Sequence, residues 1–345
     1  MAEVQRFDRL RAQAQRRRWF VGLRVDGRCR TVRAALVGVE GRGLASRVEL
    51  FAHERLELPR EVSARFERLK AHRRASPAET SLLAAQLAES QAALLDELAP
   101  RVAPVWERVL AIAVDDPGVW RRWQGLQCRA GLCDAARLAE LCGQNVIDAF
   151  ADRDLAQGGQ GRPLEPVPEW ILLHDAQHAR AVAHLGRMCR MTYLPPSRDA
   201  TGAVGVRSVR WKPAPTAGPP DVADAIVGQM TSQFPQTPPI KELFLRIRPT
   251  DFAPIKTCLG ERMPDVHVVD PESSPVPTLA LPAASVAVLG QLHVDQVPAN
   301  SVDVTGARVP RVLGRLTPGL AAPWHRMLRD IAAAGPAVMS LRSAI

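Results

Sequence analysis

The chain has 345 residues, 46 % of them hydrophobic and 23 % charged, with a formal net charge of +9 and a pI of about 9.9. This length allows two packed domains, and the 29 prolines and 23 glycines show no period, which excludes collagen-like and low-complexity classes. No apolar run reaches the ~18–20 residues of a membrane helix, and no signal-peptide pattern is present. These features predict a cytoplasmic protein without a membrane partner.

The positive charge raises nucleic-acid binding as a hypothesis. Only four of the 45 basic residues are lysine, a skew typical of a GC-rich genome, and many of the arginines lie within residues 1–33. Aromatic residues make up 5 % of the chain, which is poor material for base stacking. A solvated basic arm is therefore favoured over a nucleic-acid partner, and residues 1–18 are expected to form a charged, partly helical lead-in.

The first half of the chain predicts a strand meander followed by helices. Successive strands are expected within residues 17–58. A helix is expected over 76–100, because Ser76, Pro77 and Glu79 form a capping box at its start, and a proline ends it. Further expected elements are a strand over 109–114, a helix over 133–144 and a strand over 145–150.

The stretch DRDLAQGGQGRPLEP (152–166) is the sharpest motif in the chain. Three glycines around one glutamine are typical of a backbone that turns with positive φ or lets another group approach closely. The carboxylate of Asp154, expected on this loop at the end of a strand, would be held by backbone hydrogen bonds. A loop of this kind is a candidate active-site element, although an aspartate before glycines can also simply cap a turn.

The second half of the chain predicts another mixture of strands and helices. The expected elements are a strand-rich section over 168–197, a Pro-rich pair of segments around one short helix at 205–240, a strand at 240–249, a helix at 249–264, a strand at 265–270, a helix at 282–293, a loop at 301–318 and a helix at 324–333. Because strands alternate with helices twice, an α/β fold in two lobes is favoured.

With these elements placed, residues 145–166, NVIDAFADRDLAQGGQGRPLEP, resemble the signature V-V-x-D-F-R-x-x-D-x-A-x-G-G-Q-G-A-P-L-V-P of the anhydro-N-acetylmuramic acid kinase family. Residues 130–147 and 304–319 resemble two further segments of that family. The resemblance covers roughly 18–320 and implies the actin-like ATPase (ribonuclease H-like) fold, in which two lobes close over a nucleotide. The expected division is a first lobe of 19–144 with about 295–345 and a second lobe of 145–294.

The family opens the 1,6-anhydro ring of a cell-wall muramic sugar with water while ATP phosphorylates the freed oxygen, in peptidoglycan recycling. The resemblance therefore implies ATP and Mg²⁺ as cofactors, an anhydro-muramic sugar as substrate, and a homodimer. Asp154 matches the family's general base, which takes the proton of the attacking water. The substrate-binding candidates are Gly158, Gly159, Gln160, Gly161 and Trp120, and no metal ligand is predicted.

The segments that match the family's nucleotide motifs are altered. The first phosphate loop, G-x-M-S-G-T-S-L-D-G, corresponds to residues 21–37, where Gly22 is kept and Arg30 replaces the aspartate. A guanidinium in place of a Mg²⁺-side carboxylate reverses the local charge. The second phosphate motif, D-T-G-P-G-N, keeps Thr201 and Gly202, and the adenosine-side glycine motif falls on RIRPTD (246–251). Gly22, Thr201 and Gly202 are thus the cofactor-binding candidates.

Several new residues stand near these motifs. Asp115 and Asp116 replace the His and Gly-Gln of a family substrate segment and, with Asp154, form a hypothetical acidic cluster for a metal or for acid–base chemistry; solvated turn positions are the competing interpretation. Arg162 would bind an anionic sugar or phosphate, or fill the cleft.

The spacing of His174 and His178 suits a helical metal pair but lacks a third ligand. The six cysteines match no zinc or redox spacing and are expected to be buried, reduced thiols.

Two hypotheses follow from the resemblance and the altered motifs. In the first, the chain is a divergent kinase of this family with Asp154 as base. In the second, it is a pseudokinase that keeps the fold and a sugar-binding or protein-interaction role without ATP turnover. The loss of nucleotide-side motifs favours the second, and nucleic-acid binding through the basic arm is a third, disfavoured class.

Overall fold

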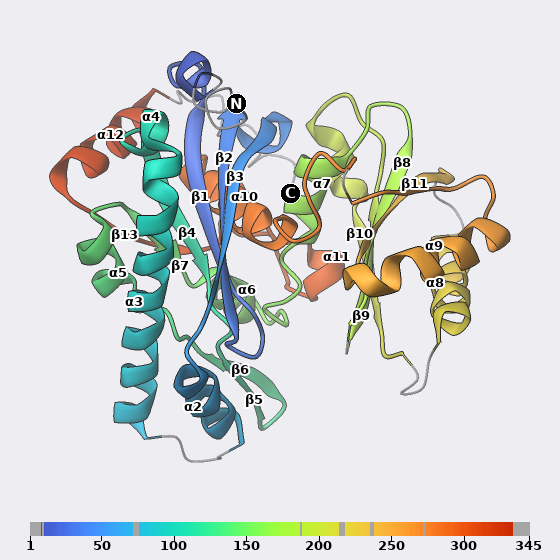
Figure 1. Cartoon of the computed structure of the whole chain (residues 1–345), viewed down its shortest axis with the longest axis horizontal. Coiled ribbons are helices and arrows are strands. Elements are labelled where there is room, and N and C mark those ends of the chain that lie inside the picture. Colours follow the sequence, from blue (N-terminus) through green and yellow to red (C-terminus); the bar gives the residue numbers. More distant parts are fainter. Residues whose placement is uncertain are drawn as a thin grey trace. The chain divides into compact units, whose positions relative to one another are not determined.

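The computed structural model describes Asp8 and residues 10–71, 76–186, 188–213, 218–234, 238–271 and 273–333. The chain forms two compact units, which we call unit 1 (Met1–Leu164 with Pro282–Ile345) and unit 2 (Glu165–Leu281). Each unit combines helices with a sheet that mixes parallel and antiparallel strands (Figure 1), which confirms the predicted α/β class.

The sheet of unit 1 has six strands in the order β13-β7-β4-β1-β2-β3. Neighbours pair antiparallel from β1 to β3, parallel from β1 through β4 to β7, and antiparallel again between β7 and β13. The strands expected within 17–58 and over 109–114 are confirmed. The bounds are β1 Arg18–Val25, β2 Thr31–Glu40, β3 Arg47–Glu57, β4 Val109–Asp115, β7 Val146–Asp148 and β13 Arg315–Thr317.

Both β1 and β4 are apolar along nearly their whole length because the sheet is covered on both faces. On one face, Trp19 and Leu23 belong to a buried cluster with the leucines of α3 (Pro77–Arg101). On the other face, Gly22 lies directly under α10 (Leu281–Val294): a Cβ placed on Gly22 would come within 2.0 Å of the carbonyl oxygen of Ala283. The core of unit 1 therefore depends on a backbone contact between β1 and α10.

The helix expected over 76–100 is α3, and Ser76 is its N-cap. The Ser76 side chain makes no capping hydrogen bond, and Pro100 lies inside the last turn instead of ending the helix. The helix expected over 133–144 is confirmed as α5, with Asp134 as N-cap and the left-handed Gly143 as C-cap. The remaining helices of unit 1 are η1 Gly43–Ala45, α2 Arg60–Ala71, α4 Ala103–Trp106, α5 Ala135–Cys142, α6 Phe150–Ala156, α11 Val302–Thr305 and α12 Ala321–Ala332.

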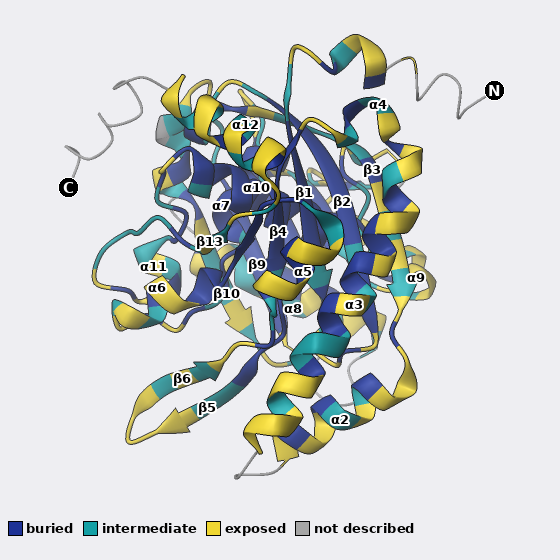
Figure 2. Cartoon of the chain, turned by 90° about the vertical axis from the view of Figure 1, so that its left-hand side faces the viewer, coloured by how far each residue is buried: buried dark blue, intermediate teal, exposed yellow. Residues whose placement is uncertain are grey.

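The strands β5 (Val119–Trp123) and β6 (Leu126–Ala130) form a separate two-stranded hairpin that the sequence analysis did not predict. Its turn uses Gln124 and Gly125, both with positive φ, which matches the twist of a two-residue hairpin. Figure 2 shows the hairpin standing away from the buried sheet, with exposed residues at its tip. Trp123 and Leu126 face each other there and are 71 % and 70 % exposed.

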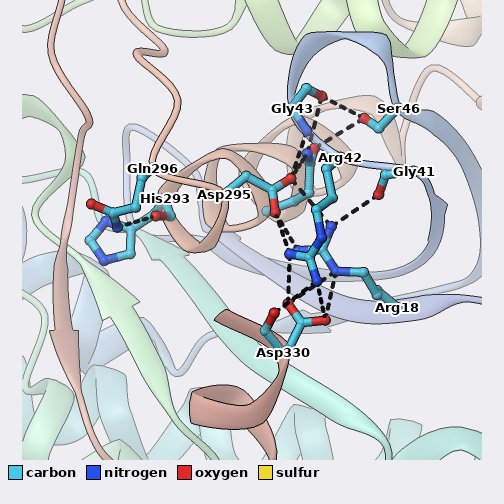
Figure 3. Close-up of polar contacts among 10 residues, drawn as sticks. Arg18, Gly41, Arg42, Gly43, Ser46, His293, Asp295, Gln296 and Asp330 are labelled. Carbon is cyan, nitrogen blue, oxygen red and sulfur yellow. Dashed lines mark hydrogen bonds and ion pairs between the residues drawn. The ribbon is translucent and has the colours of Figure 1, made fainter. Parts of the chain in front are cut away.

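A buried ionic network joins four elements of unit 1 (Figure 3). Asp295, just after α10, accepts a hydrogen bond from the N–H of Gly43 at 2.8 Å and pairs with Arg18 and Arg42. Both arginines also pair with Asp330 of α12. Two positive and two negative groups are thus balanced, and β1, η1, α10 and α12 are tied together by charge-assisted hydrogen bonds.

The sheet of unit 2 has five strands in the order β10-β9-β8-β11-β12. The strands β8, β11 and β12 are parallel, and β9 and β10 continue the sheet antiparallel. The bounds are α7 Pro166–Leu173, β8 Ala179–His184, β9 Cys189–Leu194, η2 Ala200–Gly205, β10 Arg207–Trp211, α8 Pro219–Gln233, β11 Ile240–Arg246, α9 Pro249–Arg262 and β12 His267–Val269. The expected strands at 240–249 and 265–270 and the helices at 249–264 and 282–293 are confirmed.

Three predicted elements are wrong. Residues 149–150 do not continue a strand, because Phe150 begins α6. The segment from Pro166 to Leu173 is the helix α7, buried on all sides, and such a short apolar run has no periodicity that separates strand from helix. The expected loop at 301–318 contains α11 and the edge strand β13.

The observed units differ from the expected lobes at both boundaries. Residues 145–164 belong to unit 1 because β7 pairs with β4, and residues 282–294 belong there because α10 covers β1. Of the expected lead-in, residues 1–7 and 9 lie outside the described residues. Within the described part of the chain, no helix has the length and apolarity needed to span a bilayer.

Candidate functional site

The Gly-Gly-Gln-Gly loop begins where α6 ends. The N–H groups of Gly158 and Gly159 donate to the carbonyl oxygens of Leu155 and Asp154, so the loop turns directly off the last helical turn. Gly158 and Gly161 adopt φ values of +80° and +70°, a left-handed region that favours glycine. The tight turn predicted from the glycines is therefore confirmed at these two positions.

Asp154 lies in the last turn of α6, not on the glycine loop, and its exposed fraction is 0 %. One carboxylate oxygen accepts hydrogen bonds from Asn300 Nδ2 at 2.7 Å and Thr305 Oγ1 at 2.6 Å. The other accepts from the N–H of Gly161 at 2.7 Å. We call this group the Asp154 clamp, since it joins α6, the glycine loop and α11.

The glycines of the loop fit closely around this clamp. A Cβ on Gly159 would come within 2.2 Å of the Asp154 carboxylate, and the N–H of Gln160 donates to the carbonyl oxygen of Thr305 at 2.9 Å. Sequence analysis did not identify Asn300 or Thr305 as partners. Thr305 lies in the stretch that resembles the family's C-terminal segment, so that resemblance was the available signal.

Trp120, another of the substrate-binding candidates, lies against the far end of the loop. A Cβ on Gly161 would come within 2.9 Å of the indole ring, and the indole N–H donates to the Pro117 carbonyl at 2.8 Å. The guanidinium groups of Arg162 and Arg129 lie 5.1 and 5.8 Å from the ring centroid. Trp120 thus lies between the loop and two guanidinium groups that carboxylates also contact, and cation–π attraction helps to hold these side chains together.

The hypothetical acidic cluster does not form. Asp115 pairs with Arg24, and Arg162 approaches it at 3.4 Å while donating to the carbonyl oxygen of Asp116 at 2.9 Å. Asp116 is buried, which contradicts the solvated interpretation, and pairs with Arg129. Its carboxylate also accepts from the N–H groups of Gly118 and Leu132 at 2.8 and 2.9 Å.

Each carboxylate therefore has its own partners, and arginines separate them. No group of three or more His, Cys, Asp or Glu side chains among the described residues could hold a metal ion. The imidazole of His174, one of the two histidines considered for metal binding, stacks on the Trp170 ring, and the ring centroids are 4.3 Å apart. The prediction of buried thiols is wrong for Cys128, which is exposed on the hairpin, whereas Cys29 and Cys189 are buried.

The turn between β1 and β2, which corresponds to the first phosphate loop, is filled by a carboxylate of the chain itself. Asp26 accepts hydrogen bonds from the N–H groups of Arg28 at 2.7 Å and Arg30 at 2.9 Å. It also accepts from the N–H and, at 2.9 Å, the hydroxyl of Thr31. The donors that a phosphate loop would present to a nucleotide are thus bound to Asp26.

The second phosphate motif lies in unit 2, in η2. The N–H of Gly202 approaches Ser197 Oγ at 3.3 Å, and a Cβ there would come within 2.4 Å of Ser197 Cβ and 2.8 Å of the Trp170 ring. Gly202 is therefore required for packing. The side chain of Thr201 lies outside the described part of the chain.

Unit 2 also contains a buried charged cluster that the sequence analysis missed. Glu169 of α7 contacts His184 Nε2 at 2.6 Å and pairs with Arg190 of β9. Arg246, at the end of β11, lies 3.1 Å from His184 Nδ1. A neutral imidazole can donate from Nε2 to Glu169 and accept at Nδ1 from Arg246, while Arg190 Nη2 lies 2.6 Å from the same Nε2. Charged residues within otherwise apolar segments were the signal for this cluster.

The pKa values of this cluster are displaced in a consistent direction. Burial lowers the pKa of His184, Arg190 lowers it further, and Glu169 opposes them, so that the pKa falls from 6.5 to about 4. Burial raises the pKa of Glu169, but Arg190 and His184 outweigh it and hold the value at about 2. At neutral pH the cluster therefore contains a carboxylate, an uncharged imidazole and two guanidinium groups.

Comparison with known protein families shows to which family the chain belongs. The family model described as anhydro-N-acetylmuramic acid kinase matches residues 19–204, more than half of the sequence. The chain belongs to the anhydro-N-acetylmuramic acid kinase family. This confirms the resemblance of the glycine-loop signature and places the chain among sugar kinases of the actin-like ATPase fold.

Individual members of the anhydro-N-acetylmuramic acid kinase family are similar over different lengths. The Bordetella avium kinase is 30 % identical over 253 residues, which covers 53 % of this chain and 67 % of that protein. The Bordetella pertussis kinase is 29 % identical over 251 residues, covering 53 % and 66 %. The Gloeobacter violaceus kinase is 43 % identical over 63 residues, covering 18 % and 17 %. The matched regions thus cover between about a sixth and two thirds of the length of these relatives.

Proposed function

We propose that this chain is a divergent member of its family that binds an anhydro-muramic sugar and has reduced or lost ATP-dependent phosphoryl transfer. In this proposal Trp120 and residues 158–161 contribute to the sugar site, and Arg162 contacts an anionic group of the sugar. The observation that carries the proposal is the Asp154 clamp: the side chain matching the family's general base is fully buried and accepts three hydrogen bonds. In this arrangement the carboxylate has no exposed surface to present to an attacking water.

The residues that would hold ATP and Mg²⁺ do not fit those groups. The β1–β2 turn gives its donors to Asp26, so a phosphate would have to displace a carboxylate of the same charge. Asp115, at the end of β4, pairs with Arg24 instead of presenting a free carboxylate to a cation. Gly22 is covered by the backbone of α10. These contacts support a protein without nucleotide turnover, and no phosphoryl-transfer step is assigned to these residues.

An active kinase is the alternative, favoured by family membership. It would require Asp154 to become exposed and Asp26 to leave its turn, and ATP with Mg²⁺ would then act as in the family. We further propose, from the family alone, a homodimer in the cytoplasm that acts in peptidoglycan turnover.

Calorimetry and a turnover assay test the proposal directly. Purified protein is titrated with 1,6-anhydro-N-acetylmuramic acid and, separately, with Mg-ATP, and ADP release is followed with both present. We expect the sugar to bind, with neither ATP binding nor ADP release. ADP release that disappears in Asp154→Asn would establish the kinase instead.

A matched pair of tryptophan variants tests the sugar site. Trp120 contacts Gly161, whereas Trp123, three residues further on the same hairpin, is exposed at the tip. We expect Trp120→Ala to weaken sugar binding by about tenfold or more, since a buried contact surface is removed, and Trp123→Ala to leave it unchanged. Equal affinities in the two variants would contradict the placement of the sugar.

A further inference from the structure

A basic hollow of about 540 Å³ lies in unit 1, away from the Asp154 clamp and the β1–β2 turn. One wall is the segment of residues 11–16, and the other is the chain that leads from α4 into β4. Three arginines, Arg11, Arg16 and Arg108, line it together with Gln15, and among the described residues the lining contains no acidic side chain. A concave surface of this size with three guanidinium groups attracts anions.

The N-terminal wall is held in place by the core. Leu10 and Ala14 are buried in the main cluster of unit 1. The Trp19 indole N–H donates to the carbonyl oxygen of Ala14 at 3.3 Å, and the N–H of Arg16 donates to the carbonyl oxygen of Gln13 at 3.1 Å. The arginines of this wall are therefore presented by a fixed backbone, so less conformational entropy is lost when a ligand binds.

The two arginines that follow this wall in the sequence are, by contrast, paired with carboxylates of the fold. Arg17 pairs with Glu40 and Glu49, and Arg18 pairs with Asp295 and Asp330 (Figure 3). In contrast, no carboxylate among the described residues pairs with any of the three arginines that line the basic hollow. The fold thus supplies acids for two consecutive arginines and leaves the lining of the hollow positively charged.

The positive charge extends beyond the hollow to α12. Burial lowers the pKa of Arg326; Glu107 opposes this effect, and the charges of Arg329 and Arg108 add to it. Arg329 and Arg108 are therefore each close enough to repel Arg326, and Glu107 partly offsets this repulsion. Since like charges held together destabilise a fold unless an anion joins them, the arrangement favours an anionic occupant.

We propose that the basic hollow binds a small phosphorylated molecule. Guanidinium groups match phosphate oxygens with paired hydrogen bonds, and three of them converge here from two segments. The volume lies within the range of small-molecule sites. Within the part of the chain that the structure describes, the lining contains no aromatic side chain for base stacking, which disfavours a single-stranded nucleic acid as the occupant.

Calorimetry with glucose 6-phosphate, glucose and inorganic phosphate at constant ionic strength tests this site. We expect glucose 6-phosphate to bind and glucose to give no heat. Arg16→Gln and Arg108→Gln should each weaken binding about tenfold, because each removes a charge-assisted hydrogen bond. Arg122→Gln, which neutralises an exposed arginine of the β5–β6 hairpin, is the matched control and should bind as the wild type does.

Thermal melting of each variant shows that it is folded, as expected for exposed positions. Equal binding of inorganic phosphate and glucose 6-phosphate, with the same dependence on Arg16 and Arg108, would still support the site. Unchanged affinity in both variants, or an equal loss in Arg122→Gln, would overturn it. A 12-nucleotide single-stranded RNA that displaces glucose 6-phosphate through the same arginines would replace the small molecule with a nucleic acid.

Discussion

Each unit contains a completely buried carboxylate, Asp154 in unit 1 and Glu169 in unit 2, and these two are satisfied in different ways. In unit 1, Asp154 accepts hydrogen bonds from an amide side chain, a hydroxyl and a backbone N–H, all uncharged. In unit 2, Glu169 is balanced by Arg190 and by His184. The first arrangement fixes a loop through directional hydrogen bonds, whereas the second depends on opposite charges in a poorly hydrated interior.

This difference determines how each unit responds to change. Neutral donors around Asp154 do not titrate, so protonation of a partner cannot loosen the glycine loop. The partners of Glu169 carry or acquire charge, so unit 2 is sensitive to the loss of one arginine and to acid. Substitutions at the two sites, with stability followed by native-state hydrogen exchange in peptides of each unit, separate these responses.

The largest effect is expected from Arg190→Met. This change leaves the buried carboxylate of Glu169 without its main counter-charge, which costs about 3–5 kcal/mol of the unfolding free energy of unit 2. The double variant Glu169→Gln/Arg190→Met removes both charges and should recover much of the loss. A single variant within about 0.5 kcal/mol of wild type would show that the ion pair contributes nothing to stability.

Acid is expected to weaken unit 2 next. The unfolded chain protonates the His184 imidazole below pH 6.5, whereas the folded unit does so only near pH 4, so stability falls as the pH is lowered through this window. Within this window the unfolding free energy should fall by up to about 1.4 kcal/mol per pH unit, the value for uptake of one proton. Below pH 4.5 the unfolded chain also protonates Glu169, whose folded pKa is about 2, and the loss continues. Hydrogen exchange between pH 7 and 4 measures it, and His184→Gln should flatten the dependence.

Asp154→Asn should destabilise unit 1 by about 2–3 kcal/mol. In either orientation, the new amide NH₂ group faces a donor: the N–H of Gly161 on one side, or Asn300 Nδ2 and Thr305 Oγ1 on the other. Urea unfolding measures the change. Asp152→Asn is the matched control: Asp152 lies on the same helix and its side chain is 55 % exposed. Its partner Arg129 is buried but keeps its pair with Asp116, so the change should cost under about 1 kcal/mol. Similar losses in the two variants would remove the special role of the clamp.

The smallest effect is expected for Thr305→Val, which keeps the shape of the side chain and removes one of the three hydrogen bonds to Asp154. We expect a loss of about 1 kcal/mol in unit 1, with unit 2 unchanged. Thr257→Val, at an exposed position of α9, should leave both units as they are. A loss of more than about 3 kcal/mol would mean that the hydroxyl supports more of the loop than its contacts indicate.

Much of the fold was predictable because its signals are local. The strand meander, α3, α5 and the strands and helices around 240–294 follow from periodicity, caps and turn residues. The helix α7 was not, since all eight of its residues are buried and an apolar run of that length suits a strand equally well.

The turn of the glycine loop was predictable from the sequence, but the contacts around Asp154 were not. The glycines identified the loop, and Trp120 does lie beside it. Of the three partners of Asp154, the N–H of Gly161 is local, but Asn300 and Thr305 are 146 and 151 positions away in the chain, so no local pattern could indicate that this carboxylate is enclosed. Asp26 occupies a position of the phosphate-loop segment, and this became visible only from the backbone donors that converge on its carboxylate.

The contact between Gly159 and Asp154 also restricts the order in which this chain can change over time. Any larger residue at 159 meets the carboxylate at 2.2 Å, so Asp154 would have to be shortened or lost first, and its removal leaves Asn300 and Thr305 with unsatisfied polar groups. A substitution at Gly159 or at Asp154 alone is therefore destabilising. The aspartate and its glycine are held together by packing alone, and a lineage that had stopped phosphorylating sugars would still inherit both.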